Sequence, residues 1–146
     1  RSGAFTERKS VMATFRDIDE ARAYFEGDRF AVENGMTLDE LGEDWSVCSM
    51  AVTPGCRNAN GGVMGGAIFT LADFAFAAAC NNVHRPTVAQ QVSVNFLSGT
   101  RGSRLVATAK CRRNGRTTCV YNVDVVDDLG RDIAQFVGTG FKVRGE

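Results

Sequence analysis

Hydrophobic and polar residues alternate along four stretches in the second half of the chain, and a period of two is typical of half-buried β-strands. The stretches are TVAQQVSVNFL (87–97), RLVATAKCR (104–112), TTCVYNVDVV (117–126) and RDIAQFVGTGFKV (131–143). Residues 98–103, Asn114-Gly115 and DDLG (127–130) separate them. Asn-Gly between two alternating runs is a strong hairpin signal. We therefore expect these strands to form an antiparallel meander.

One apolar stretch lacks this alternation: GGVMGGAIFTLADFAFAAACNN, residues 61–82. Gly65-Gly66 and Asn81-Asn82 are typical of helix ends, so we predict a helix of about 16 residues, roughly 24 Å long. The helix is apolar on all sides and is therefore expected to be buried. Its many alanines let a sheet approach closely. The predicted fold class is α+β, with one long central helix wrapped by an antiparallel β-sheet.

The first third of the chain supplies smaller elements. Residues 17–35, DIDEARAYFEGDRFAVENG, have helix-forming content with apolar residues at helical spacing. We expect them to cover an edge or end of the core. Residues 36–53 are expected to form two short strands around Gly42, and a loop, PGCRNANGGV (54–63), follows. Residues 1–11 precede Met12 and are expected to be an added or disordered segment without a function, which leaves one domain over residues 12–146.

Composition narrows the classes of function. Of the 146 residues, 44% are hydrophobic, and Lys plus Arg equals Asp plus Glu at 17 each. A net charge of zero does not favour nucleic acid as a partner, and no apolar run of membrane-spanning length interrupts the chain. The five cysteines lack C-x-x-C spacing and there is one His, so no metal or cofactor is expected. Unpaired, reduced thiols are typical of a cytoplasmic protein.

Asp73 is the one formal charge between Arg57 and Arg85, and it lies in the middle of the apolar helix. Burying an unpaired carboxylate commonly costs several kcal/mol. Two interpretations are open. The carboxylate either hydrogen-bonds to backbone or pairs with an Arg from a strand, or it is there for chemistry.

The glycines before the helix favour the second interpretation. A loop with Asn58, Asn60, Gly61 and Gly62 leads into Gly65-Gly66. Glycines let a ligand approach the backbone, and N–H groups at a helix start favour developing negative charge. They would supply an oxyanion donor for a carboxylate acting as nucleophile or base. A tight turn with close packing is the alternative explanation of the glycines.

Helix geometry constrains such a site. Gly66 and Asp73 are seven residues apart, so they share a face but lie about 10.5 Å apart along the axis. One helix cannot easily hold both groups against one reacting carbon. A second, antiparallel copy could bring its Asp73 to the first copy's Gly65, which predicts a dimeric site.

The stretch from Asn58 to Asn82 resembles the signature of hotdog-fold acyl-CoA thioesterases of the phenylacetate-degradation (PaaI-like) type. The similarity continues through FAVENGMTLDEL (30–41), VNFLSGTRGSRLVATA (94–109) and residues 114–141, and covers roughly residues 29–143. It implies a hotdog fold and hydrolysis of aryl- or medium-chain acyl-CoA thioesters. It also implies a homodimer or a dimer of dimers, with no cofactor, because coenzyme A is part of the substrate.

The resemblance also implies roles for single residues. Asp73 takes the place of the catalytic carboxylate, Gly65 that of the glycine whose N–H binds the thioester oxygen, and Asn58 that of the Asn that positions water or substrate. The family's His before Gly-Gly is Met64 here, and Met can neither donate a hydrogen bond nor carry a proton. The competing hypothesis is therefore a non-catalytic acyl-CoA-binding protein of the same fold.

Further residues are candidates for substrate binding. Met64 and Gly66 lie at the helix start. Thr70 is one turn before Asp73 and could orient its carboxylate, although Thr often bonds to its own helix backbone. By the resemblance, the strand face that carries Gln91 and Ser93 lies near the site, and a solvated strand face is the alternative.

Basic residues around the predicted hairpin are the last candidates. Arg112 and Arg116 flank Asn114-Gly115 and could meet the phosphates of coenzyme A. Solvated turn charges are the alternative. Trp45 and the Phe residues are expected to lie in the core.

Overall fold

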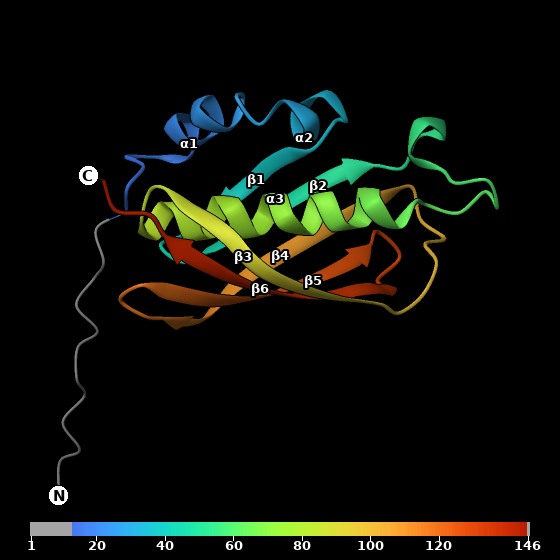
Figure 1. Cartoon of the computed structure of the whole chain (residues 1–146). Coiled ribbons are helices and arrows are strands. Elements are labelled where there is room, and N and C mark those ends of the chain that lie inside the picture. Colours follow the sequence, from blue (N-terminus) through green and yellow to red (C-terminus); the bar gives the residue numbers. More distant parts are fainter. Residues whose placement is uncertain (1–12, 146) are drawn as a thin grey trace, which may run out of the picture.

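The computed structural model is built around one long helix, α3 (Gly65–Val83), held in the curve of a six-stranded sheet (Figure 1). The structure describes residues 13–145, so the segment predicted at 1–11 lies outside the described residues. The helix has 19 residues, begins at Gly65 as predicted and ends one residue after Asn82. The α+β architecture of a wrapped central helix is confirmed.

The sheet is antiparallel throughout and has the strand order β1-β2-β4-β5-β6-β3. Its strands are β1 (Thr37–Leu41), β2 (Trp45–Ala51), β3 (Thr87–Phe96), β4 (Arg104–Asn114), β5 (Thr118–Asp127) and β6 (Asp132–Lys142). The predicted meander is correct for β4, β5 and β6. It is wrong for β3, which pairs with β6 and forms one edge of the sheet, because the connection 97–103 is longer than a tight hairpin loop.

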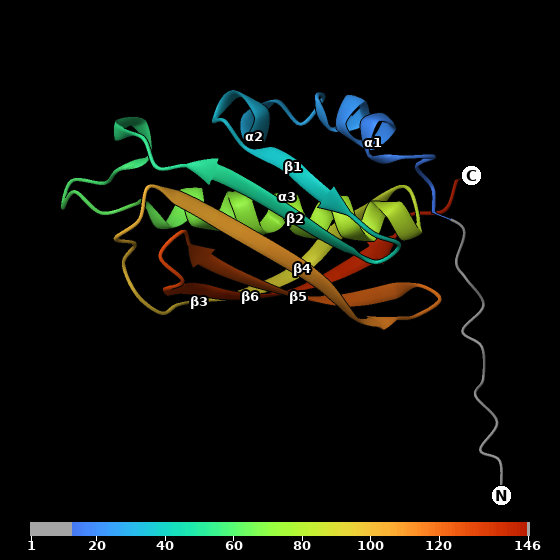
Figure 2. The same ribbon diagram turned by 180° about the vertical axis from the view of Figure 1, so that it is seen from behind.

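The predicted helical segment 17–35 is two short helices, α1 (Ile18–Phe25) and α2 (Arg29–Glu33). Asp17 begins α1 as its N-cap, where its carboxylate accepts a hydrogen bond from Glu20 N at 2.9 Å. Both helices lie on the β1 side of α3 (Figures 1 and 2). The ring of Phe25 meets that of Phe74 edge-on, with centroids 5.8 Å apart. This segment therefore covers a flank of the core, as predicted.

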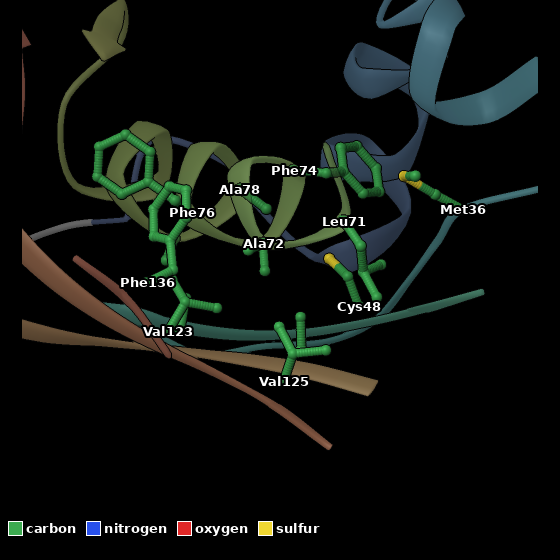
Figure 3. Close-up of a cluster of buried hydrophobic side chains, with 14 of the residues drawn as sticks. Met36, Cys48, Leu71, Ala72, Phe74, Phe76, Ala78, Val123, Val125 and Phe136 are labelled. Atoms are coloured by element: carbon green, nitrogen blue, oxygen red, sulfur yellow. The ribbon is translucent and has the colours of Figure 1, made fainter. Parts of the chain in front are cut away.

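The core lies between α3 and the concave face of the sheet (Figure 3). Ala72, Ala75 and Ala79 are fully buried, and their small side chains let the strands approach the helix closely. Ser46 of β2 donates a hydrogen bond to the backbone oxygen of Ala75 at 2.6 Å. By length and composition alone α3 could cross a membrane, but 61% of its apolar window is buried inside the domain, as in a core helix.

The expectation that Trp45 and every Phe lie in the core is wrong. Trp45 is 40% exposed on the outer face of the sheet, and Phe30 of α2 is 67% exposed. Phe69 and Phe96 are also exposed. Phe69 lies on a side of α3, and Phe96 at the end of β3, that the single chain leaves uncovered.

Candidate functional site

Asp73 lies on the one side of α3 that neither the sheet nor the short helices cover. Gly66, Phe69, Thr70, Asp73 and Ala77 follow one another at helical spacing along this side, and all five are exposed or half-buried. We call them the open stripe of α3. The prediction that the helix is buried all round is therefore wrong for this stripe within one chain.

The carboxylate of Asp73 is half-buried and has no partner in the described part of the chain. Within residues 13–145 it accepts no hydrogen bond and takes part in no salt bridge. Burial raises its pKa above the ordinary Asp value of 3.8, and repulsion from Asp28, the N-cap residue of α2, raises it further. The structural ion pair considered from the sequence is not present among these residues, so the geometry favours a chemical role.

The start of α3 presents backbone donors. Met64 is the N-cap residue and makes no side-chain capping bond. Its carbonyl oxygen accepts the N–H groups of Ala67 and Ile68 at 3.0 and 3.3 Å. The N–H groups of Gly65 and Gly66 have no acceptor among residues 13–145. Two unsatisfied donors at the positive end of a helix form a site suited to an oxyanion.

The loop before the helix is held in place by Asn58. Its Oδ1 accepts hydrogen bonds from Asn60 N at 3.0 Å and from Gly62 N at 3.2 Å. Gly61 has a φ of +84°, a left-handed conformation that favours glycine. The glycine loop is therefore a tight turn, as one interpretation had it, and this turn also places Asn58 next to the helix start. The Asn58 Nδ2 group donates to no acceptor within residues 13–145.

Two cavities adjoin the start of α3. The first, which we call the β3 cavity, has a volume of about 390 Å³ and is bordered by Asn58, Gly65, Phe96 and residues 97–100. The ring of Phe96 lies against Gly65, because a Cβ at position 65 would be 3.2 Å from Phe96 Cζ. The second, the α2 cavity, also has about 390 Å³ and lies between α2 and the open stripe. A ligand at the helix start can therefore extend in two directions.

Thr70 does not orient the carboxylate of Asp73. Its hydroxyl donates a hydrogen bond to Gly66 O at 2.8 Å, which is the alternative considered from the sequence. Thr70 does line the α2 cavity, together with Met64 and Gly66. Three predicted substrate-binding residues are thus brought together beside the helix start.

Gln91 and Ser93, predicted to lie near the site, are on the outer face of the sheet. Ser93 is opposite Val137 in the β3–β6 ladder, and Val137 follows Phe136, whose ring centroid is 5.7 Å from that of Phe69 on α3. Because successive strand residues point to opposite faces, Ser93 and Gln91 point away from α3. Within one chain the structure therefore places them on an exposed strand face and does not bring them to Asp73.

Arg112 and Arg116 flank the β4–β5 turn, which lies at the C-terminal end of α3 and far from Gly65 in the same chain (Figures 1 and 2). Lys142 ties this turn to β6 by donating a hydrogen bond to Gly115 O at 2.6 Å. The single chain therefore does not bring these arginines to the helix start.

Sequence reasoning missed the residue that anchors one wall of the β3 cavity. The carboxylate of Asp127 accepts hydrogen bonds from Thr100, from the N–H groups of Arg101 and Gly102, and from two N–H groups of its own turn. Burial acts to raise its pKa, but these hydrogen bonds outweigh burial and lower the pKa to about 2. The DDLG motif that was interpreted as a strand break thus also fixes the loop beside Gly65.

The part of the chain that carries the candidate site is similar in sequence to known proteins. Residues 60–134, which include Gly65 and Asp73, match the family model of the Thioesterase superfamily. The acyl-coenzyme A thioesterase PaaI of Escherichia coli (strain K12) is 35% identical over 126 residues, which are 86% of this chain and 90% of that protein.

Solved structures give the same result. The PaaI protein of the E. coli phenylacetic acid degradation operon superposes with a TM-score of 0.81 at 33% identity, over 86% of this chain and 91% of that chain. A variant of the phenylacetic acid degradation protein PaaI from Thermus thermophilus gives 0.75 at 30% identity, over 80% of this chain and all of that one (100%). A thioesterase protein from Streptococcus pneumoniae TIGR4, solved with coenzyme A, gives 0.75 at 25% identity, over 82% and 96%.

Proposed function

This chain belongs to the thioesterase superfamily with the hotdog fold, and from that premise we propose that it hydrolyses acyl-CoA thioesters to a free acid and coenzyme A. The observation that carries the proposal is the unpaired carboxylate of Asp73, whose pKa is raised, on the open stripe of a helix that begins with unsatisfied N–H groups. The E. coli relative is named an acyl-coenzyme A thioesterase, and the S. pneumoniae thioesterase was solved with coenzyme A.

The proposed chemistry needs one base or nucleophile and one oxyanion donor. Ionised Asp73 either attacks the thioester carbonyl carbon or removes a proton from a water molecule that attacks it. In the first route the C–S bond breaks to release the coenzyme A thiolate, and water then hydrolyses the mixed anhydride on Asp73. In the second, the C–S bond breaks after water adds, and the thiolate takes up the proton. In both routes the Gly65 N–H stabilises the oxyanion.

A raised pKa suits Asp73 to this work. A carboxylate with a higher pKa is a stronger base when it is ionised. Asn58 is proposed to hold water or the thioester with its unused Nδ2 group, next to Gly65. Met64, Gly66 and Thr70 are proposed to contact the substrate from the wall of the α2 cavity.

The site is proposed to form across a homodimer. Gly65 and Asp73 are eight residues apart on one helix, or about 12 Å along its axis, so one chain does not place both at one carbon. β3 is an edge strand and has exposed apolar residues at its ends, with Val88 at 49% and Phe96 at 56%. A long unpaired edge strand of this kind invites pairing with another chain. Two antiparallel copies of α3 would then bring Asp73 of one to Gly65 of the other.

Such a dimer would also bring the arginines of one chain toward the site of the other. Arg112 and Arg116 are proposed to contact coenzyme A phosphates only from the partner chain, since their own helix start is distant. Pairing of two dimers remains the larger assembly implied by the resemblance. Because acyl-CoA esters are intracellular metabolites, the proposed location is the cytoplasm.

One observation favours a second candidate function, an acyl-CoA-binding protein without catalysis. Met64 occupies the place of the family's His, is 54% exposed, and makes no side-chain capping bond. If that His is essential, Asp73 and Gly65 alone would bind a substrate and leave it intact. The two candidates differ in one product, the free thiol of coenzyme A.

Thiol release tests the proposal directly. The protein is mixed with aryl, medium-chain and long-chain acyl-CoA esters, and free thiol is followed with a chromogenic thiol reagent. The thioesterase proposal expects catalytic release from at least one apolar ester. Binding of these esters without any release would support the second candidate and contradict the first.

A further inference from the structure

The α2 cavity differs in chemistry from the β3 cavity, although both border the helix start. None of the residues that line the α2 cavity is charged. Its rim includes the exposed side chains of Phe30, Met64 and Phe69, and its deepest residues are Met36 and Met50, which are 3% and 1% exposed. The floor is therefore made of thioether side chains, which are apolar, flexible and only weak hydrogen-bond acceptors.

The polar groups of the cavity wall already donate to the chain's own backbone. Asn34 Nδ2 donates to Phe30 O at 2.7 Å, Thr70 Oγ1 to Gly66 O at 2.8 Å, and Cys56 Sγ to a carbonyl of its own turn. The donors that remain, the second N–H of Asn34 and the backbone N–H of Gly66, belong to exposed residues at the mouth of the cavity and not to its buried floor. A hydroxyl or carboxylate that reached the floor would lose its water without a matching partner, which is costly.

The β3 cavity has the opposite character. Asn58, Ser98 and Thr100 contribute polar side chains to its lining, and the glycine loop exposes backbone there. The amide-bearing arm of coenzyme A needs hydrogen-bond partners, and this cavity offers the unused Nδ2 group of Asn58. The hydroxyls of Ser98 and Thr100 already donate to Asp132 O and to Asp127. The thioether floor of the α2 cavity offers no such partner to an amide or a phosphate. In a thioester bound at the helix start, the polar coenzyme A half would therefore lie in the β3 cavity and the apolar acyl half in the α2 cavity.

We infer that the α2 cavity binds the acyl half of the substrate and selects an uncharged apolar acyl chain that carries no polar substituent. The inference rests on the proposed function, because it places the thioester at the start of α3. The volume of about 390 Å³ falls in the range of roughly 300–1,000 Å³ of small-molecule sites. The acyl chain enters past Met64 and ends against Met36 and Met50.

Binding of thioether analogues tests this inference without requiring hydrolysis. The probes are S-methyl-CoA, S-hexyl-CoA and S-(6-hydroxyhexyl)-CoA, and dissociation constants are measured by titration calorimetry. S-hexyl-CoA should bind at least tenfold more tightly than S-methyl-CoA, because its chain fills the cavity. The terminal hydroxyl should weaken binding by about 10- to 100-fold, which is the usual discrimination of an apolar pocket against an added hydroxyl.

Two variants locate the effect. Ala67 lines the cavity, and the larger side chain of Ala67→Leu should fill part of it. The variant should bind S-hexyl-CoA at least tenfold more weakly and should bind S-methyl-CoA with unchanged affinity. Ala23→Leu makes the same change on the exposed surface of α1 and should alter neither affinity. Phe30→Ala removes an exposed rim residue, whose loss does not threaten the fold, and should also weaken only S-hexyl-CoA.

Each other result contradicts the inference. Equal binding of S-hexyl-CoA and its hydroxylated analogue would show that the floor does not select against polar groups. Equal losses for S-methyl-CoA and S-hexyl-CoA in Phe30→Ala would show that the acyl chain lies elsewhere, even if Ala67→Leu does not fold. Equal affinities for S-hexyl-CoA and S-methyl-CoA in the unmodified protein would also show that the acyl chain does not bind in this cavity. If the preference is found but no thiol is released from acyl-CoA esters, the proposed function fails while the inference about the cavity stands.

Discussion

The carboxylates of Asp73, in the middle of α3, and Asp28, at the start of α2, repel each other although 45 residues of sequence separate them. Neither takes part in a salt bridge within residues 13–145. A fold that needed Asp73 only for structure would be expected to place a cation beside it. This chain instead places a second negative charge there, which raises the pKa of Asp73 further above that of an ordinary Asp.

The first prediction concerns pH. Asp73 must be ionised to act as base or nucleophile, so kcat/KM should fall as pH drops through its raised pKa. The acid limb of the pH profile should therefore lie above the ordinary Asp value of 3.8. Asp28→Asn removes the like charge and should shift this limb to lower pH with little change on the plateau. Burial, the larger cause, remains, so the limb should stay above 3.8.

The control for this measurement is Asp124→Asn, which changes an exposed carboxylate on β5. Its profile should superimpose on that of the unmodified protein. An acid limb that does not move in Asp28→Asn, or that moves upward, would show that Asp73 does not set the pH dependence.

The second prediction is a dimer. The open stripe of α3 and the free edge of β3 leave Phe69 and Phe96 exposed at 38% and 56%, and a partner chain would cover them. Light scattering at micromolar concentration should give at least twice the chain mass of 15.7 kDa. A monomer under these conditions would contradict the shared site.

The third prediction concerns Met64, where this chain departs from the family pattern. Met64→His should leave the fold intact, because this N-cap side chain is 54% exposed and makes no capping bond. It should raise turnover or redirect it to other acyl groups, since a His can donate a hydrogen bond next to Gly65. Turnover is compared across a panel of acyl-CoA esters, with Met64→Ala as the control. Loss of activity in Met64→His with retention in Met64→Ala would show that the position has no such role here.

The fourth prediction concerns the anchor of the loop beside Gly65. The pKa of Asp127 is lowered to about 2 from 3.8, so its ionised form stabilises the fold above pH 3.8, and this stabilisation is lost as pH falls toward 2. Asp127→Asn should lower Tm near neutral pH, because the five donors lose a charged acceptor. The difference in Tm should shrink as pH falls below about 4. A Tm difference that is constant between pH 7 and pH 2, with Asp124→Asn as reference, would contradict this role.

The elements with strong local signals were predictable from sequence. The glycines at the start of α3 and the alternation of β4, β5 and β6 give the correct elements, and Asp73 stood out as the lone charge of an apolar helix. Which strands pair was less accessible, because the contact of β3 with β6 joins segments that are distant in sequence. No local pattern states that β3 lies at an edge of the sheet, with β5 and β6 between it and its predicted neighbour β4.

The parts of the site that could not be predicted depend on distance. Gln91 and Ser93 alternate with valines of β3 that pack against the core, so alternation indicates which face carries them but not how far that face lies from Asp73. Arg112 appeared suitable by charge, but charge gives no distance from Gly65. The α2 cavity is assembled from α2, β2, the turn at Cys56 and α3, and no single stretch of sequence carries its signature.

The most direct test of the central claim is Asp73→Asn, with Tm and kcat/KM measured on the same preparation and Asp124→Asn as the matched control. The amide is nearly isosteric but is neither a base nor a useful nucleophile, so thioester hydrolysis should fall by about 10²–10⁴-fold or more. Tm should stay the same or rise, because the half-buried carboxylate with its raised pKa and no partner is removed. A variant that is destabilised but hydrolyses thioesters at the unmodified rate would contradict the account and show that Asp73 holds the helix.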